Sequence, residues 1–138
     1  MIGLDTNVLA RYYVSDESDP EAGKQRKAAR SLMESGAPLM VCKTVILEFE
    51  WVMRGYYEFS PADTAKALNH LFSLAHVTIE ERESVRQALA HVHAGLEFAD
   101  AIHCASYREC TSIVSFDDKK FARRVRRLGL SPSVTVPA

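Results

Sequence analysis

Short apolar runs alternate with amphipathic stretches along almost the whole chain. The first run, Met1–Leu4 (MIGL), predicts a short buried strand, and a helical pattern follows immediately in Thr6–Tyr13. A second helix is predicted over Pro20–Ser35, because Asp19 is a favourable N-cap and proline suits the first helical position. Gly36 is the expected stop of this helix.

Four further apolar runs predict strands, at Leu39–Cys42, His76–Ile79, Ser112–Ser115 and Ser133–Val136. The stretches between them predict helices at Lys43–Tyr57, from Ser60 onward, at Glu81–Ala94, at Glu97–Cys110 and at Asp117–Leu128. Strands that alternate with helices need crossover connections. The predicted fold class is therefore α/β, with a parallel sheet and helices on both faces.

The length and composition indicate one globular domain, residues 1–138, with a substantial core. No apolar stretch reaches the length of a membrane span, and the N-terminus does not have the pattern of a secretory signal. The three cysteines, Cys42, Cys104 and Cys110, lie in apolar patterns, which predicts reduced core residues in a cytoplasmic protein. The net charge of −1 neither requires nor excludes a polyanionic partner, since charge can be segregated locally.

Acidic residues stand where predicted strands give way to helices. Asp5 follows the first strand and Asp117 follows the fourth, while Asp100 lies in the first turn of its helix among small and apolar residues. Ligands bind beyond the carboxyl ends of the strands in parallel α/β sheets. A shared acidic site is one interpretation. The other is that each acid caps its own helix, which is common at such positions.

Glu48 does not fit the capping interpretation. It lies about one and a half turns into the helix that follows the second strand. The predicted buried stripe of this helix consists of residues spaced at i, i+4, i+7 and i+11, namely Val45, Phe49, Val52 and Tyr56. Glu48 would flank that stripe, whereas Glu50 would point elsewhere.

Four segments of the chain carry these acids, in this order: LDTNVL, VILEFEWVM, FADAIHCAS and VSFDDKKF. Their order and spacing resemble those of the motifs of PIN-domain ribonucleases, and specifically of the VapC toxins of bacterial toxin–antitoxin pairs. The resemblance covers nearly the whole chain. It implies a three-layer PIN-like fold in which helices flank a five-stranded parallel sheet.

The resemblance also implies roles for individual residues. It places the acidic positions of one cleft, both catalytic and metal-binding, at Asp5, Glu48, Asp100 and Asp117, and the accompanying polar positions at Thr6, Asn7 and Ser115. Glu97 departs from the pattern, since many relatives carry aspartate there. Asp118 is adjacent to Asp117 and is interpreted as a first-turn acid that could assist.

Four carboxylates in one cleft would need a counter-charge, because two unit charges 4 Å apart repel by about 4 kcal/mol at an effective dielectric near 20. Oxygen ligands select hard ions, so one or two Mg²⁺ or Mn²⁺ ions are expected. The histidines do not build a zinc site, although His103 could support Asp100. The predicted function is a metal-dependent endoribonuclease that cleaves RNA by attack of a metal-activated water on a phosphodiester.

The stretch KKFARRVRRLG supplies the positive charge that the net charge conceals. Lys119, Lys120, Arg123 and Arg124 lie nearest Asp117 and are the predicted RNA contacts. The remaining arginines of the stretch are interpreted as a solvated helix face.

The resemblance further implies a VapB-like antitoxin that covers the active site, and a homodimer. Predicted antitoxin contacts are the aromatic residues Trp51, Tyr56, Tyr57 and Phe59. A catalytically inactive PIN-like module that binds RNA or protein is the alternative. Haloacid-dehalogenase phosphatases fit poorly, because they need an aspartate where this chain has Asn7, and receiver domains fit poorly because the strand His76–Ile79 lacks the phospho-acceptor.

Overall fold

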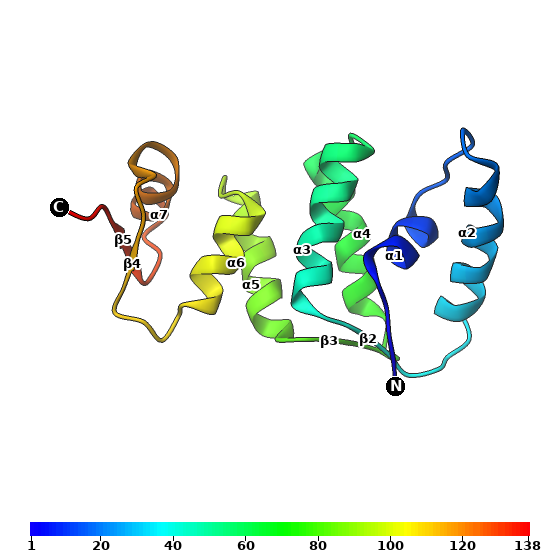
Figure 1. Ribbon diagram of the computed structural model, residues 1–138. Helices are drawn as coiled ribbons and strands as arrows, with labels where there is room; N and C mark the ends of the chain where they lie inside the picture. Colours follow the sequence, from blue (N-terminus) through cyan, green and yellow to red (C-terminus); the bar gives the residue numbers. More distant parts are fainter. The chain divides into compact units, whose positions relative to one another are not determined.

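The computed structural model describes all 138 residues, which form two compact units (Figure 1). Unit 1 comprises Met1–Glu80 and unit 2 comprises Glu81–Ala138. Each unit contains its own parallel sheet and its own helices. The predicted α/β class with parallel strands is therefore confirmed within each unit.

Unit 1 holds a three-stranded sheet. Its elements are β1 (Ile2–Gly3), α1 (Thr6–Tyr13), α2 (Pro20–Met33), β2 (Leu39–Val41), α3 (Lys43–Trp51), a π-helical turn η1 (Val52–Tyr56), α4 (Pro61–Ser73) and β3 (Val77–Ile79). The strand order is β1-β2-β3, so β2 is central, with Ile2 opposite Leu39 and Leu39 opposite Val77. The core is built from apolar side chains of β2, α1, α3 and α4, including Leu39, Leu9, Phe49 and Leu68.

The helix starts of unit 1 follow the predicted chemistry. The Asp19 carboxylate accepts a hydrogen bond from the Glu21 N–H at 3.0 Å, and Pro20 occupies the first turn of α2. At the start of α4, the Ser60 hydroxyl oxygen accepts from the Asp63 N–H at 3.1 Å. Such caps satisfy N–H groups that have no partner inside the helix.

Unit 2 holds a two-stranded sheet. Its elements are α5 (Arg82–His93), α6 (Phe98–Ser106), β4 (Ser112–Val114), a π-helical turn η2 (Asp118–Ala122), α7 (Arg123–Leu128) and β5 (Ser133–Thr135). Strands β4 and β5 pair in parallel, and α5 packs against α6. Gly129 ends α7 in the left-handed conformation (φ 65°), which glycine adopts without a steric penalty.

The five strands pair as three and two, not as the single five-stranded sheet that the resemblance implied. β1 hydrogen-bonds to β2 alone and β4 to β5 alone, so each forms an edge. For the same reason the strand predicted as buried is exposed, with 46% of Ile2 accessible. Only Leu4 of that run is buried.

Two other local predictions are corrected. The helix predicted over Lys43–Tyr57 is α-helical only to Trp51 and then widens into η1, where the Tyr57 N–H donates to the carbonyl of Val52, five residues earlier. Of the predicted core cysteines, Cys104 is buried, Cys42 is half-buried and Cys110 is exposed, because Cys110 lies beyond the end of α6. No helix combines the length and the apolar character that crossing a membrane requires.

Candidate active site

Asp117 is presented by a short turn after β4 in unit 2. The Asp117 N–H donates to the Ser115 hydroxyl oxygen at 3.0 Å, and the Asp117 carboxylate accepts from the Lys120 N–H at 3.0 Å. The first bond holds the turn, and the second caps η2. Ser115 therefore fixes the backbone of Asp117, while one carboxylate oxygen of Asp117 stays available to a ligand.

Asp100 faces the same space from the first turn of α6. We call this space the acidic hollow. Its volume is about 340 Å³, and it is lined by Asp100, His103, Tyr107, Ile113, Val114, Ser115, Asp117 and Phe121. The sequence-predicted residues Asp100, Asp117 and Ser115 are thus brought together within unit 2.

The electrostatics of the acidic hollow are unfavourable for negative charge. Partial burial raises the pKa of Asp100, and the neighbouring Glu97 and Asp117 raise it further, whereas His103 and Arg124 act in the opposite direction. Arg124 is the nearby cation, but its guanidinium lies 3.8 Å from the Glu97 carboxylate. Neither Asp100 nor Asp117 has an ion-pair partner. A bound cation would therefore relieve the repulsion between their carboxylates.

Asp5 and Glu48 belong to unit 1. The Asp5 carboxylate accepts from the Thr6 N–H at 2.8 Å and caps α1, while Glu48 is exposed on α3. Helices α1 and α3 follow β1 and β2, so both acids lie beyond the carboxyl edge of the same sheet. The four predicted acids therefore fall into two pairs, and neither unit alone gathers three side chains able to hold a metal ion.

The predicted orientation of α3 is wrong by one residue. Ile46, Phe49, Glu50 and Met53 are buried, and the exposed aromatic Tyr56 lies off this face. Glu50, predicted to point away, is only 6% accessible, and its carboxylate lies 2.7 Å from the Arg54 guanidinium. Glu48 consequently faces solvent, where a carboxylate is free to take a ligand.

The other polar positions play separate parts. Thr6 is buried, and its hydroxyl has no hydrogen-bond partner. The Asn7 side chain does not contact the Asp5 loop through a hydrogen bond; it lines a pocket between α1 and α2.

The PIN-domain family model matches residues 2–127 of the chain. The chain belongs to the PIN-domain family. A search of curated proteins found no match. PIN domains are generally nucleases, so membership indicates a nuclease-type, hydrolytic function for this chain.

PIN-domain nucleases typically use divalent metals, and the donor set of this PIN domain suits such an ion. The lining of the acidic hollow offers carboxylate oxygens and the His103 imidazole but no cysteine thiol, which favours Mg²⁺ or Mn²⁺ over zinc. Mg²⁺ is commonly held by one or two carboxylates together with substrate phosphates. Asp100 and Asp117, which have no cationic partner, are the residues of unit 2 that would hold it.

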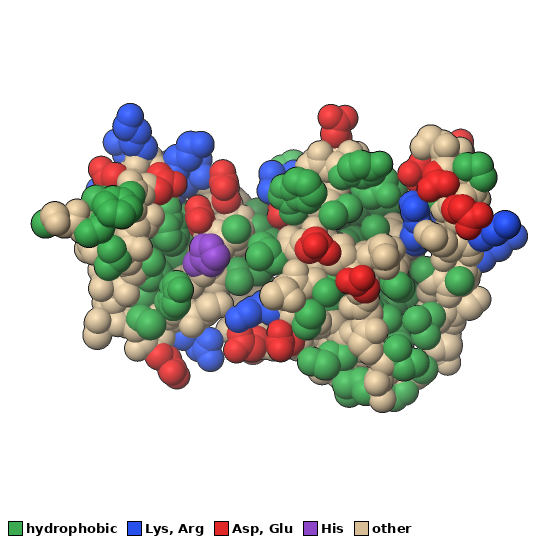
Figure 2. Space-filling view, viewed as in Figure 1, with side chains coloured by type: hydrophobic (Ala, Val, Ile, Leu, Met, Phe, Trp, Pro, Cys, Tyr) green, Lys and Arg blue, Asp and Glu red, His purple; other side chains and the backbone are tan.

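The basic residues predicted to bind RNA lie around η2 and α7 of the PIN domain. Lys119, Lys120 and Arg123 are exposed, whereas Arg124 is half-buried and faces Glu97. Figure 2 shows Lys and Arg side chains beside Asp and Glu side chains on this part of the surface. A phosphate backbone approaching Asp117 would therefore meet three accessible cations.

Two aromatic residues at this site escaped the sequence-based analysis. Tyr107 lines the acidic hollow and is 49% accessible, and Phe116, between Ser115 and Asp117, is 84% accessible. For Phe116, the sequence did offer a signal of orientation. Side chains alternate along an extended segment, so Phe116 is expected to point away from the side chains of Ser115 and Asp117. The sequence alone did not indicate that this side would be exposed.

The predicted antitoxin contacts lie in unit 1. Trp51 and Tyr56 are 60% and 69% accessible, and Figure 2 shows hydrophobic side chains gathered on the surface over this region. Tyr57 and Phe59 are half-buried. Nothing in the structure covers Trp51 and Tyr56, and their role in partner binding stays a prediction.

Proposed function

We propose that this PIN domain is a metal-dependent endoribonuclease of the VapC toxin type. The observation that carries the proposal is the acidic hollow, which Asp100 and Asp117 line without an ion-pair partner in a chain that belongs to a nuclease family. Accessible lysine and arginine side chains next to Asp117 support a nucleic-acid substrate.

The proposed metal site includes Asp5 and Glu48 in addition to Asp100 and Asp117, and holds one or two Mg²⁺ or Mn²⁺ ions. Asp5 and Glu48 follow β1 and β2 of unit 1, and Asp100 and Asp117 line one hollow of unit 2.

The chain's own residues would prepare the substrate for hydrolysis. Ser115 and the Lys120 N–H fix Asp117, and the α1 cap fixes Asp5, so both carboxylates are positioned before substrate binds. Lys119, Lys120 and Arg123 would bind the phosphates flanking the scissile bond. When bound, the divalent ion would acidify the attacking water and neutralise charge on the phosphate.

The proposal also covers partners and location. A VapB-like antitoxin would cover the exposed aromatics Trp51 and Tyr56, and the protein would act as a cytoplasmic homodimer. The three free cysteines, one of them exposed, support a reducing compartment. Light scattering of the purified chain tests the dimer, and co-expression with a cognate antitoxin tests neutralisation.

The nuclease assay compares wild type with Asp5→Asn and Asp100→Asn on a mixed RNA pool. Each substitution should lower cleavage by at least about 100-fold, as expected when an electrostatic contact of the transition state is removed. Asparagine remains a good N-cap, so the stability of Asp5→Asn should change by less than about 0.5 kcal/mol. Glu83→Gln, which removes the charge of an exposed carboxylate of α5 that lies 3.9 Å from Arg86, is the matched control and should retain full activity.

Metal dependence is tested in the same assay. Cleavage should disappear in EDTA and return with Mn²⁺ or Mg²⁺. Activity that survives thorough chelation would eliminate the metal mechanism, and wild-type protein that binds RNA but never cleaves it would instead establish the inactive binding module. Sequencing RNA ends after induction of wild type and Asp5→Asn in cells would then identify the target.

A further inference from the structure

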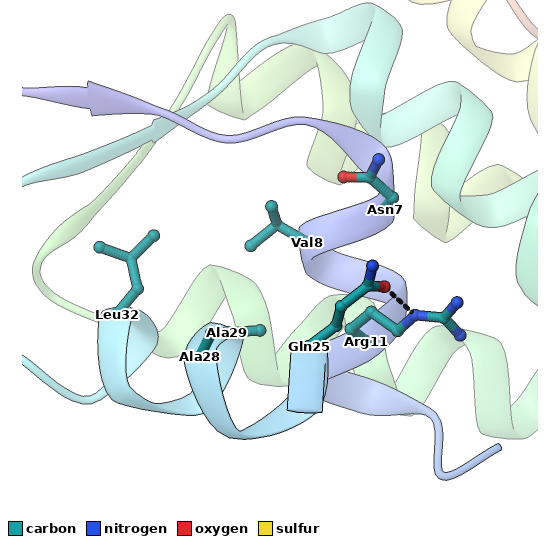
Figure 3. A pocket seen from close by; sticks show the side chains of 7 residues that line it. All are labelled: Asn7, Val8, Arg11, Gln25, Ala28, Ala29 and Leu32. Carbon is teal, nitrogen blue, oxygen red and sulfur yellow. Dashed lines mark hydrogen bonds between the residues drawn. The ribbon is translucent and has the colours of Figure 1, made fainter. Parts of the chain in front are cut away.

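A second pocket lies in unit 1, between α1 and α2 (Figure 3). Its volume is about 270 Å³, below the range of roughly 300–1,000 Å³ typical of sites for drug-sized ligands. It is lined by Asn7, Val8, Arg11, Gln25, Ala28, Ala29 and Leu32. Its size suits one flat group and not a peptide helix or a folded ligand.

The polar side of this pocket is neutral. The Arg11 Nε–H donates to the Gln25 side-chain oxygen at 2.8 Å. The rest of the guanidinium faces two carboxylates, Asp19 at 3.4 Å and Asp16 at 3.9 Å. The charge of Arg11 is thus neutralised by carboxylates of unit 1. The pocket therefore lacks the free positive charge that binding of a phosphate or a carboxylate requires.

Two amide groups remain to recognise a ligand. Arg11 occupies the oxygen of Gln25 but leaves its amide hydrogens available, and the Asn7 amide has no hydrogen-bond partner. Figure 3 shows the Gln25 amide nitrogen directed toward the side of the pocket on which Asn7 lies. Val8, Ala28, Ala29 and Leu32 supply apolar walls. Donors and acceptors between apolar walls match the edge and faces of a nucleobase.

We propose that this pocket reads a single unstacked base of the RNA substrate and so sets the cleavage specificity. The inference rests on the proposed function, because the substrate must be RNA. Asn7 lies two residues after Asp5, in the first turn of the helix that Asp5 caps, so a base next to a phosphate at Asp5 is within reach. Gln25 makes the specific contact, and Arg11 positions it.

Binding without metal tests the pocket independently of catalysis. Fluorescently labelled RNA heptanucleotides are prepared in a uridine and in a cytidine background, with only the central base varied, and their anisotropy is measured in EDTA. Wild type should prefer one central base by about three- to tenfold, the value of one or two neutral hydrogen bonds. Gln25→Ala should abolish this preference and leave affinity for the disfavoured RNAs unchanged.

Ser31→Ala, an exposed polar position of the same helix, is the matched control and should keep the preference. Arg11→Lys removes the Nε–H that holds Gln25, so it should weaken the preference as well. Equal binding of all RNAs by wild type, or an unchanged preference in Gln25→Ala, would overturn the proposal and leave the pocket to a protein partner.

Cleavage mapping separates this inference from the proposed nuclease function. If wild type cleaves, Gln25→Ala should broaden the distribution of cleavage sites, whereas Asp5→Asn should remove cleavage altogether. If wild type prefers one base in EDTA but never cleaves RNA in Mn²⁺, base recognition by the pocket is supported and the proposed nuclease function is rejected. Metal-dependent cleavage with an identical site distribution in wild type and Gln25→Ala would retain the nuclease and reject the pocket.

Discussion

At the scale of single residues, Asp100 is the electrostatic centre of the acidic hollow. Burial is the largest cause of its raised pKa, and the nearby carboxylates Glu97 and Asp117 add to it. A carboxyl group whose pKa rises on folding favours the folded state when protonated and opposes it when ionised. Such a residue costs stability at neutral pH, which is typical of a group kept for binding.

This gives a pH-dependent prediction for Asp100→Asn in EDTA. The stabilising contribution of protonated Asp100 is complete below its ordinary pKa of 3.8 and is lost as pH rises through the raised folded-state pKa. The neutral asparagine avoids this loss. The free energy of unfolding of the variant, relative to wild type, should therefore increase over this interval and then level off.

Urea unfolding at several values from about pH 3 to pH 7 measures this difference. A difference that stays constant over the whole range would show that Asp100 is not desolvated in the folded chain. Addition of Mg²⁺ at neutral pH should make wild type more stable than Asp100→Asn, because an ion bound to the native state stabilises wild type selectively.

At the scale of elements, α3 is a helix whose position was predicted correctly but whose buried face was not. The sequence offers apolar side chains at Val45 and at its neighbour Ile46, and the stripes that begin at these two residues are about 100° apart on the helix. The structure buries the stripe of Ile46. Glu50 is therefore nearly buried and pairs with the partly exposed Arg54 of the following turn, whereas Glu48 points outward.

The two glutamates of α3 should accordingly separate stability from activity. Glu50→Ala removes a nearly buried carboxylate 2.7 Å from Arg54 and should destabilise the fold by about 1–3 kcal/mol. Glu48→Ala should change stability by less than about 0.5 kcal/mol, as at other surface positions, but abolish cleavage. Chemical denaturation measures the stability of each variant, and the nuclease assay measures its activity. If Glu48→Ala destabilised the fold as much as Glu50→Ala, this would contradict the observed orientation of α3.

At the scale of the whole molecule, the proposed site depends on the two units acting as one domain. Asp5 and Glu48 belong to unit 1, and Asp100 and Asp117 to unit 2. If the chain folds as one domain, the unfolding of one unit is coupled to the unfolding of the other. Cooperative unfolding is thus a consequence of the predicted single domain.

Trp51 allows a direct test of this coupling, since it is the one tryptophan of the chain and lies in unit 1. Leu89→Ala truncates a buried side chain of α5 in unit 2 and should cost about 2–5 kcal/mol. If the chain unfolds as one domain, the midpoints from Trp51 fluorescence and from far-UV circular dichroism should fall together. A fluorescence midpoint that stays at the wild-type value would show that the units unfold independently.

Local chemistry determined much of this protein from its sequence alone. The start of α1 and the caps Asp19 and Ser60 follow from side chains that act on their own backbone within a turn or two, and the apolar runs indicated where each strand lies. The same is true of the turn that presents Asp117 after β4, where Ser115 is two residues away. Such features need no knowledge of the rest of the chain.

Only the tertiary structure decided which faces are buried and which strands are partners. The burial of Glu50, the exposure of Ile2 at a sheet edge and the meeting of Asp100 with Asp117 all depend on contacts between segments distant in sequence. The neutral pocket of Asn7 and Gln25 likewise exists because α1 packs against α2. Periodicity constrains one element at a time, whereas these outcomes are set by the packing free energy of several elements together.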